Sequence, residues 1–539
     1  MLHNPMFRLL KLSCLGALAL PMGALASSCS NMSDKCENTN TCAGLDADAG
    51  DAGSCADPST QPCAISNARG LFVSAATGSD TDGAADGTRE KPFRSVGKAL
   101  ATARVQKKNV YVCAGAGDYT EVQTLTIDAA FTGVSLFGGF NCADWTYATT
   151  LKAKIVSSSP NAIIVDGVTS GMQLADFEVQ AADATQLGTS SLAVQVRSSQ
   201  SVTLRRVKVT AGRGAAGAPG MPGGKGADGV AGEDAKNGRD AYCPTGLQPA
   251  LRMNQPGGIS VPGSACGSIG GKGGGVSAVV DSAASDGESG LPRTNLAWSD
   301  VDNAGKGEAA GGSNKQGGEG SPGNPGPDAL AADEVGTWMA GGYAPASGRA
   351  GTNGSPGQGG GGGGASKSNA SCVGASGGAG GMGGCGGGAG QGGGGGGASV
   401  ALFVWQSGVT IEACELIARD GGVGRNGGDG GQGGGGAGGG AGGRGAGTAA
   451  AGGRGGDGGT GGGGGSGSGG TGGASYALVS HGNAVTQVGN NSLTAGSGGA
   501  AGAGGSLIGL GVDPAPPGSV GANGKQLVCS ASVPCVSRP

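Results

Sequence analysis

Three closely spaced aspartates, within Asp80-Thr-Asp-Gly-Ala-Ala-Asp86, are the first residues whose types suggest chemistry. Hard cations bind several carboxylate oxygens at once, so Asp80, Asp82 and Asp86 are candidate Ca²⁺ ligands. The segment lacks the closing glutamate of an EF-hand loop. Acidic, glycine-containing segments also form ordinary solvated turns, which is the interpretation we favour. Ca²⁺ is the only cofactor that the sequence suggests.

Histidine chemistry is poorly represented. The 539 residues include two histidines, and His3 lies in a segment that we expect to be removed. Ser-His-Asp and Cys-His catalysis and His-ligated metal sites all need more than the remaining His481. This residue, in Ser-His-Gly-Asn beside a β-type run, is predicted to be a structural turn residue.

Nucleotide and nucleic-acid binding are also disfavoured. Many G-x-G-x-x-G strings occur in the glycine-rich segments, but none follows a strand and opens a helix, and there is no P-loop motif. The net charge is only -4, and no basic stripe is present, so we expect no nucleic-acid partner.

The fifteen cysteines indicate disulfide bonds formed in an oxidising compartment. They are scattered and lack the paired C-x-x-C spacing of a zinc site. Cys14 lies in the expected signal segment. Spacing does not fix the connectivity of the others, but short separations suggest four local pairs, which are Cys113–Cys142, Cys243–Cys266, Cys372–Cys385 and Cys529–Cys535.

Residues 1–28 have the features of an export signal. Arg8 and Lys11 give the positive start, and Leu12–Ala26 gives an apolar stretch that is too short to span a bilayer. Two processing routes compete. Ala24-Leu25-Ala26 fits ordinary cleavage and a secreted product.

The second route is lipidation. Ala26-Ser27-Ser28-Cys29 resembles a bacterial lipobox, which implies a lipid on Cys29 and attachment to the membrane. It departs from that pattern at Ala26, where leucine is usual. The polar residues 29–68 that follow suit a flexible, cysteine-containing tether, so we expect a lipoprotein of the outer membrane or cell surface, or a secreted form.

The stretch Gly70–Tyr119 contains a β-type run (Leu71–Ser74), a helical pattern with Pro92 near its start, and a second β-type run (Val110–Cys113). It resembles the opening of right-handed parallel β-helix proteins of the pectate-lyase-like superfamily, in which such a string forms an N-terminal capping helix and first coil. The matching residues are Val73, Ser74, Gly78, Ser79, Asp80, Gly87, Thr88, Lys91, Pro92, Phe93, Ala99, Leu100, Val110, Tyr111, Val112, Gly117, Tyr119 and Glu121. Further short β-type runs lie at 122–127, 134–137, 151–156 and 162–165.

An internal repeat supports stacked coils. The pattern φ-x-φ-x-x-φ-x-φ, in which φ is apolar, occurs at 172–179, 202–209 and 409–416, with a degraded copy at 486–493. Stacking would align two apolar columns, which are Leu174, Leu204, Ile411 and Val488, and Phe177, Val207 and Cys414. At one outward position, Glu178, Lys208 and Glu415 alternate in sign, as do Asp176 and Arg206 at another. Neighbouring parallel strands would pair these charges, so we predict that the copies are adjacent in space.

Glycine-rich blocks interrupt this repeat at one position, beginning at Gly212, Gly421 and Gly496. From Gly214 to Gly232, glycine falls at every third residue, which fits polyproline II geometry. Packed polyproline II strands and flexible disorder both remain open. The blocks resemble the Gly-rich repeats of mycobacterial PGRS-type surface proteins.

The expected fold is therefore all-β: a short right-handed parallel β-helix with an N-terminal capping helix and long polyproline II or disordered insertions. The expected divisions are the signal peptide (1–28), tether (29–68), first coils (69–211), insertion (212–396), coil (397–420), insertion (421–473), coil (474–496), and a Gly/Pro-rich tail with a Cys pair (497–539).

We expect a structural or adhesive surface protein that contacts cell-surface or matrix polysaccharide and reaches the membrane through its lipid. The alternative is a carbohydrate-active enzyme or a non-catalytic polysaccharide-binding relative. The resemblance implies that a lyase would need acidic residues around Ca²⁺ and a Lys or Arg base. The available residues are Asp166, Asp176, Asp183, Arg197, Arg205, Arg206 and Lys208.

Overall fold

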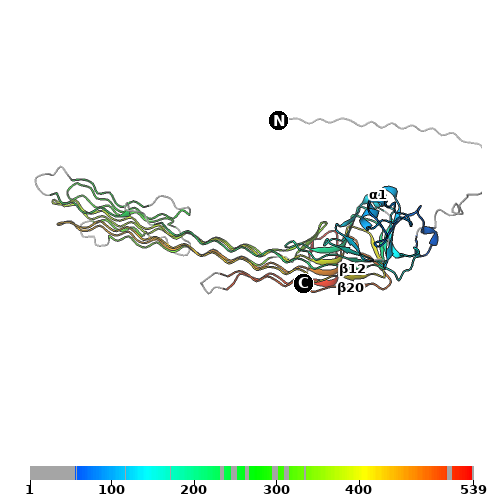
Figure 1. Ribbon diagram of the computed structural model, residues 1–539. Coiled ribbons are helices and arrows are strands. Elements are labelled where there is room, and N and C mark those ends of the chain that lie inside the picture. Colours follow the sequence, from blue (N-terminus) through cyan, green and yellow to red (C-terminus); the bar gives the residue numbers. More distant parts are fainter. Residues whose placement is uncertain are drawn as a thin grey trace, which may run out of the picture. The chain divides into compact units, whose positions relative to one another are not determined.

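The structure is a computed structural model, in which the described residues belong to one compact unit that begins at Asp57, apart from Cys55. The described residues are 55, 57–115, 117–169, 171–230, 236–244, 252–260, 266–293, 302–308, 315–332, 336–506 and 513–536. The expected signal segment, the lipidation site Cys29 and most of the tether lie outside them. The fold is predominantly β, and its large sheets are parallel (Figure 1).

Three parallel sheets form the body of the fold. The first sheet contains, in spatial order, β1 (Gly70–Val73), β2 (Asn109–Ala114), β5 (Leu136–Asn141), β8 (Met172–Ala175), β11 (Val202–Arg205), β16 (Val409–Glu412) and β19 (Thr486–Val488). The second contains β3 (Tyr119–Glu121), β6 (Ala153–Ser157), β9 (Phe177–Gln180), β12 (Lys208–Thr210), β17 (Glu415–Ile417) and β20 (Ser492–Thr494). The third contains β4 (Leu125–Ile127), β7 (Ile163–Asp166), β10 (Ser191–Arg197), β15 (Ser399–Trp405), β18 (Ser475–His481) and β21 (Asn523–Cys529).

From β8 onwards the chain visits the first, second and third sheets in a fixed rotation. Leu204 lies between Leu174 and Ile411, because β11 pairs with β8 on one side and with β16 on the other. The second sheet likewise places Lys208 between Glu178 and Glu415. The prediction that the three clear repeat copies are spatial neighbours is therefore confirmed.

The fourth copy is shifted by one residue from the predicted alignment. Ile411 pairs with Gln487, and Val488 pairs with Glu412 instead of extending the apolar column. Val488 is 46% exposed, whereas Val485 is buried. The connection from β18 keeps the register of the one from β15 to β16, so Val485 takes the place of Val409, and the extra residue lies between β19 and β20.

The core lies between the three sheets and is covered at its beginning by α1 (Val96–Gln106). Ser95 caps this helix by accepting from the Lys98 N–H. The apolar face of the helix, with Val96, Leu100 and Ala103, belongs to the same buried cluster as the strands. Two short 3₁₀ helices, η1 (Pro62–Ala64) and η2 (Ala129–Phe131), complete the helical structure of the described residues.

All three glycine-rich blocks leave the sheets at the same corner, between a strand of the second sheet and the next strand of the third. They connect β12 to β15, β17 to β18, and β20 to β21. The first block also contains β13 (Thr337–Met339) and β14 (Gly342–Ala344), which form a small antiparallel sheet with β22 (Cys535–Val536). Trp338 of β13 packs on Phe403 and Tyr476 of the third sheet.

The glycine-rich segments run side by side as one hydrogen-bonded bundle, which we call the glycine slab (Figure 1). Gly217, Gly220 and Gly223 donate their N–H groups to the carbonyls of Val423, Asn426 and Asp429. A repeat of three residues, instead of the two of a β-strand, is the geometry of polyproline II. The described segments of the slab are hydrogen-bonded with a three-residue repeat, which favours packed polyproline II strands over flexible disorder.

Glycine is needed in the slab for close approach. A Cβ on Gly223 would lie 1.9 Å from the Gly388 carbonyl oxygen, and one on Gly436 would lie 1.8 Å from that of Gly458. Few glycines of the slab have a positive φ, so conformational freedom is not the main requirement.

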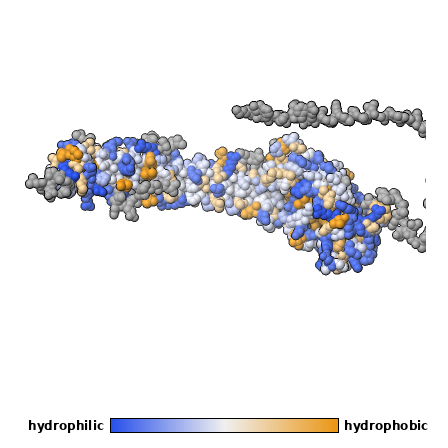
Figure 2. All heavy atoms as spheres, turned by 90° about the horizontal axis from the view of Figure 1, so that it is seen from above, coloured by the Kyte–Doolittle hydropathy of each residue, from blue (hydrophilic) through white to orange (hydrophobic). Residues whose placement is uncertain are grey.

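In Figure 2 the middle of the slab is largely pale, as glycine should be, and its orange areas are scattered.

Candidate functional site

The three candidate Ca²⁺ ligands have separate partners. Asp80 accepts from the N–H groups of Arg94 and Ser95, just before α1. Asp82 pairs with Lys98 at 2.7 Å, and the hydrogen bond from that ammonium lowers the pKa of Asp82. Asp86 accepts from the hydroxyl and N–H of Thr88, which lower its pKa. Within the described ranges, no group of three or more His, Cys, Asp or Glu side chains is placed to hold a metal ion.

The candidate functional site is a groove between α1 and the β3–β4 segment, with a cavity volume of about 730 Å³. Polar side chains from both sides line it, chiefly Ser95, Thr120, Gln123, Thr124 and Thr126. A smaller cavity of about 310 Å³, lined by Asp80, Arg94 and Asp118, lies on the other side of Glu121. Glu121 borders both cavities.

Glu121 is an unusual carboxyl group for this surface. It is 7% exposed, and its Oε1 accepts from the N–H of Val96 at 2.8 Å and of Gly97 at 3.3 Å. Burial raises the pKa of Glu121, although these two hydrogen bonds oppose the shift. The helix N-terminus also favours a carboxylate at this place. Glu121 therefore fixes α1 against β3, and it is the one carboxyl group in the groove with a raised pKa.

The charges that line the groove are neutralised in pairs. Lys98 pairs with Asp82, and Arg104 pairs with Asp128 at 2.6 Å. The groove thus presents hydroxyl groups, an amide and balanced ion pairs, which suit a neutral polar ligand such as a saccharide. It offers no nucleophile paired with a histidine, because His481 lies in β18 of the third sheet.

The residues that a lyase would need already have partners, in some cases among themselves and in others elsewhere in the fold. Arg197 contacts Asp166 at 2.8 Å, Arg205 contacts Asp57 at 2.7 Å, and Lys208 lies 3.8 Å from Glu415. Asp183 accepts from the Arg213 N–H. None of these pairs lines the groove around Glu121.

Asp176 is buried and pairs with the half-buried Arg206, which corrects the expectation that Asp176 faces outward. The Arg206 guanidinium donates to both oxygens of the fully buried Asp176, at 2.7 Å each. The hydroxyl of Tyr147 donates to the same carboxylate. This bidentate geometry compensates the cost of burying the carboxylate and leaves it unable to serve as a free ligand or base.

His481 is the last residue of β18 and not a turn residue, so that prediction is wrong. Its ring stacks on Trp405 with centroids 3.8 Å apart and planes at 7°. The two residues are register partners on adjacent strands, which places their side chains on the same face of the third sheet. Burial lowers the pKa of His481, and its Nδ1 has no hydrogen-bond partner among the described residues.

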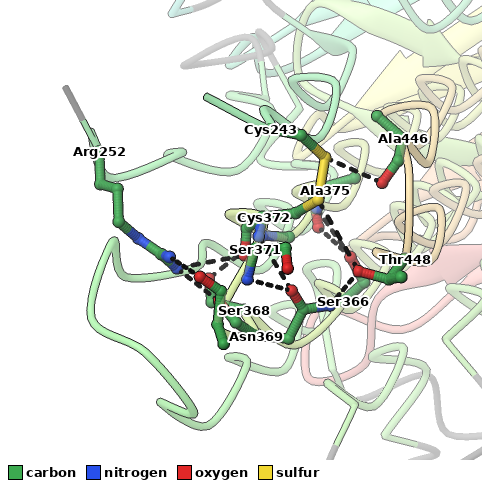
Figure 3. The surroundings of a disulfide bond; sticks show 12 residues. Cys243, Arg252, Ser366, Ser368, Asn369, Ser371, Cys372, Ala375, Ala446 and Thr448 are labelled. Atoms are coloured by element: carbon green, nitrogen blue, oxygen red, sulfur yellow. Dashed lines mark hydrogen bonds between the residues drawn. A yellow bond between two sulfur atoms is a disulfide. The ribbon is translucent and has the colours of Figure 1, made fainter. Parts of the chain in front are cut away.

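The far part of the glycine slab is fixed by disulfide bonds and by one arginine (Figure 3). Cys243 bonds to Cys372, and Arg252 donates to the carbonyls of Asn369, Ala370 and Cys372 in the loop that carries the disulfide. Asn369 in turn donates to the Thr448 hydroxyl. These bonds hold three separate glycine-rich segments together.

Two of the four predicted disulfide pairs are wrong. Cys243 bonds to Cys372 and Cys266 to Cys385, whereas the short separations suggested Cys243–Cys266 and Cys372–Cys385. Cys113–Cys142 and Cys529–Cys535 form as predicted. Cys414, a member of the second predicted column, is a buried free thiol.

Sequence reasoning did not select Glu121 as a site residue, although it closes the Gly-x-Tyr-x-Glu string of the resemblance.

Comparisons with protein-family models, with curated proteins and with solved structures each find no match. Among the described residues, no helix has both the length and the apolar character needed to cross a membrane.

Proposed function

We propose that this chain is an exported bacterial surface protein with a structural or adhesive role, anchored through a lipid on Cys29. The observation that carries the proposal is the glycine slab. Three blocks leave the sheets at one corner and hydrogen-bond to each other, and two disulfides, Cys243–Cys372 and Cys266–Cys385, join strands within the first block. Such a slab gives a stiff extension, which suits the display of a surface protein more than it suits catalysis.

The fixed rotation through three parallel sheets supports a finer proposal for the fold. A right-handed parallel β-helix of the pectate-lyase-like kind has this strand order, with α1 as its N-terminal cap. On that scaffold the glycine slab is an elaboration of one corner, similar in composition to PGRS-type surface proteins. The disulfides agree with an oxidising location outside the cytoplasm, at the outer membrane or cell surface, or secreted.

The partner that we propose is a cell-surface or matrix polysaccharide, bound in the groove between α1 and β3–β4. The groove supports this because it combines hydroxyl and amide side chains with balanced charge. The same groove supports the second candidate, a carbohydrate-active enzyme, because the raised pKa of Glu121 is a property of general acids. Ca²⁺ stays a hypothesis for the 80–86 segment.

Two measurements on the full chain test these proposals. Cys29→Ser should move the protein from the membrane fraction to the medium, and unchanged fractionation would contradict the lipid anchor. A glycan array should show binding that Thr124→Trp, which fills the groove, abolishes.

A polysaccharide-cleavage assay of the wild type and of Glu121→Gln, with and without Ca²⁺, separates the two candidates. No cleavage supports the adhesive role. Cleavage that Glu121→Gln removes would replace that role with the enzyme.

A further inference from the structure

One groove of the glycine slab is filled at one end, while its other end has no partner among the described residues. Two strands, 421–446 and 449–474, run antiparallel, and the segment 495–506 lies along both near the sheets. On one side, Gly421, Gly424 and Gly427 donate their N–H groups to the carbonyls of Ser497, Ala500 and Ala503. On the other side, Gly499, Gly502 and Gly505 donate to the carbonyls of Gly473, Gly470 and Gly467.

The same two rows continue past Ser506 without described partners. In the next turns of the first strand, the N–H groups of Gly433 and Gly436 have no acceptor among the described residues. On the second strand, the carbonyls of Gly464, Gly461 and Gly458 have no donor there. Gly436 is exposed and Gly433 and Gly461 are half-buried, so solvent reaches this part of the groove. Figure 1 shows the red-brown 495–506 segment ending while the orange strands continue.

This arrangement differs from an ordinary outer edge of the slab. An outer strand offers one row of free groups, whereas here donors from one strand and acceptors from its neighbour face the same groove. Side chains close only the flanks of the open part. The Ser466 hydroxyl accepts from the Gly430 N–H, and the Asp457 carboxylate accepts from the Gly439 N–H.

The occupied end shows what the groove accepts. A Cβ on Gly499, Gly502 or Gly505 would lie 1.9, 2.0 or 2.2 Å from a carbonyl oxygen of the 421–446 strand. The occupant must therefore carry glycine at every third residue and adopt the polyproline II conformation, so that its N–H and C=O groups meet both rows. Side chains are tolerated at one further position, that of Ser497, Ala500 and Ala503. At the third position, a Cβ on Gly498 or Gly504 would meet the carbonyls of Gly521 or Ala515, which belong to the returning 513–521 segment.

We propose that the open groove, between Gly433–Gly436 and Gly458–Gly464, binds a polypeptide strand of a partner protein that has glycine at every third residue. A second folded copy is a poor source, because the strands that bound this groove are themselves hydrogen-bonded into their own slab. The inference goes beyond the proposed adhesive role and is independent of the polysaccharide groove, which lies at α1.

The rim of the groove offers positions where a side chain can be added while the backbone hydrogen-bonding groups of the groove stay unchanged. Asp420, Asn426 and Asp429 stand in one row along the strand and accept from the N–H groups of Ser497, Ala503 and Ser506. The same row continues with Gln432 and then Gly435, where a Cβ would meet only the Asp228 carboxylate, at 3.7 Å. A side chain can therefore begin at Gly435 without a clash at its Cβ, and Gly435→Phe is the variant designed to place a ring beside the open groove.

The matched control is Gly224→Phe, on a different strand of the slab. A Cβ on Gly224 would meet no atom within 4 Å, so this position also has room for a side chain to begin at a glycine of the slab. It leaves the open groove untouched.

The test titrates the full-length protein with a fluorescent (Gly-Ser-Ala)₄ peptide and with a peptide of the same composition but irregular glycine spacing. We expect only the periodic peptide to bind, Gly435→Phe to weaken it about tenfold or more, and Gly224→Phe to leave it unchanged. Thermal unfolding of both variants should match that of the wild type.

Several outcomes would overturn the proposal. They are no binding of the periodic peptide, equal binding of both peptides, and equal loss in the two variants. Dimerisation of the protein alone that Gly435→Phe abolishes would assign the groove to a second copy instead. A negative glycan array would leave the peptide result unaffected.

Discussion

At the scale of single residues, the corners between stacked strands hold residues in a strained backbone conformation, and contacts between their side chains compensate for that strain. Asp176, Arg206 and Ala413 occupy equivalent corners between the first and second sheets, with φ of 60°, 54° and 51°. Residues with a Cβ rarely adopt this conformation. At two of these corners the side chains form the Asp176–Arg206 pair, which holds successive coils together where the backbone is least favourable. Glycine would relieve the strain but would remove that pair.

His481 gives a prediction at the same scale. Burial lowers its pKa below the ordinary 6.5, so the folded state favours the neutral ring. As the pH falls below about 6.5, the unfolded chain takes up a proton that the folded chain resists, and the free energy of unfolding decreases. His481→Phe keeps an aromatic ring against Trp405 and removes the titration. Urea unfolding between pH 7.5 and 4.5 should therefore show a smaller loss of stability in the variant than in the wild type.

Carboxyl groups titrate over the same range in both proteins, so the difference between the two curves isolates the histidine. Parallel curves would mean that His481 is as accessible to protons in the folded state as in the unfolded state. Its burial was not predictable from the sequence. Tyr476, Val479 and His481 share one face at uneven spacings of three and two residues, which emerges only when the register with Phe403 and Trp405 is known.

At the scale of elements, the repeat was the most informative part of the sequence. The φ-x-φ pairs at 172–179, 202–209 and 409–416 predicted their strands and their adjacency, because one face of each strand must be apolar to reach the core. The fourth copy failed by one residue because Gln487 faces the position that an apolar residue should hold. Glu121 was missed because its role depends on where α1 begins relative to β3, which no local pattern contains.

The disulfides were mispredicted for a physical reason that concerns the slab. The strands next to these cysteines run antiparallel to their partners, so a residue of one strand meets a residue that lies much later in the chain. Cys243 and Cys372 are separated by 129 residues, and Cys266 and Cys385 by 119. A glycine period of three residues indicates the conformation of each strand but does not identify its neighbour.

Removal of one of these bonds should loosen the far part of the slab selectively. In Cys243→Ser/Cys372→Ser, we expect the local stability of the segments around 236–260 and 369–375 to fall by about 2–4 kcal/mol, as for other long-range disulfides. Hydrogen exchange should accelerate there, while the amides of β10, β15 and β18 keep their protection. Cys113→Ser/Cys142→Ser, near the first strands, is the matched control. In it, hydrogen exchange should accelerate in the sheets, while the slab segments keep their protection. Uniform acceleration in both variants would show that slab and sheets unfold as one unit.

At the scale of the whole described unit, the stacked sheets should not need the slab in order to fold. Deletion of 213–396 leaves four residues, Ala211, Gly212, Gly397 and Ala398, between β12 and β15. The native connections at this corner from β3 to β4 and from β6 to β7 are similarly short, with three and five residues. Loop closure costs little at such lengths, so β15 should still pair with β10, and β16 with β11.

The deletion also removes β13, which covers Phe403 and Tyr476, so Phe403→Thr and Tyr476→Thr accompany it to keep the third sheet soluble. We expect a single cooperative thermal transition with the circular dichroism of β-structure. Proteolysis should be confined to 421–473 and 497–521, whose strands lose their central neighbours. A non-cooperative or unfolded product would mean that the hydrogen bonds of the slab stabilise the sheets, and that the glycine-rich blocks belong to the folding unit instead of extending from it.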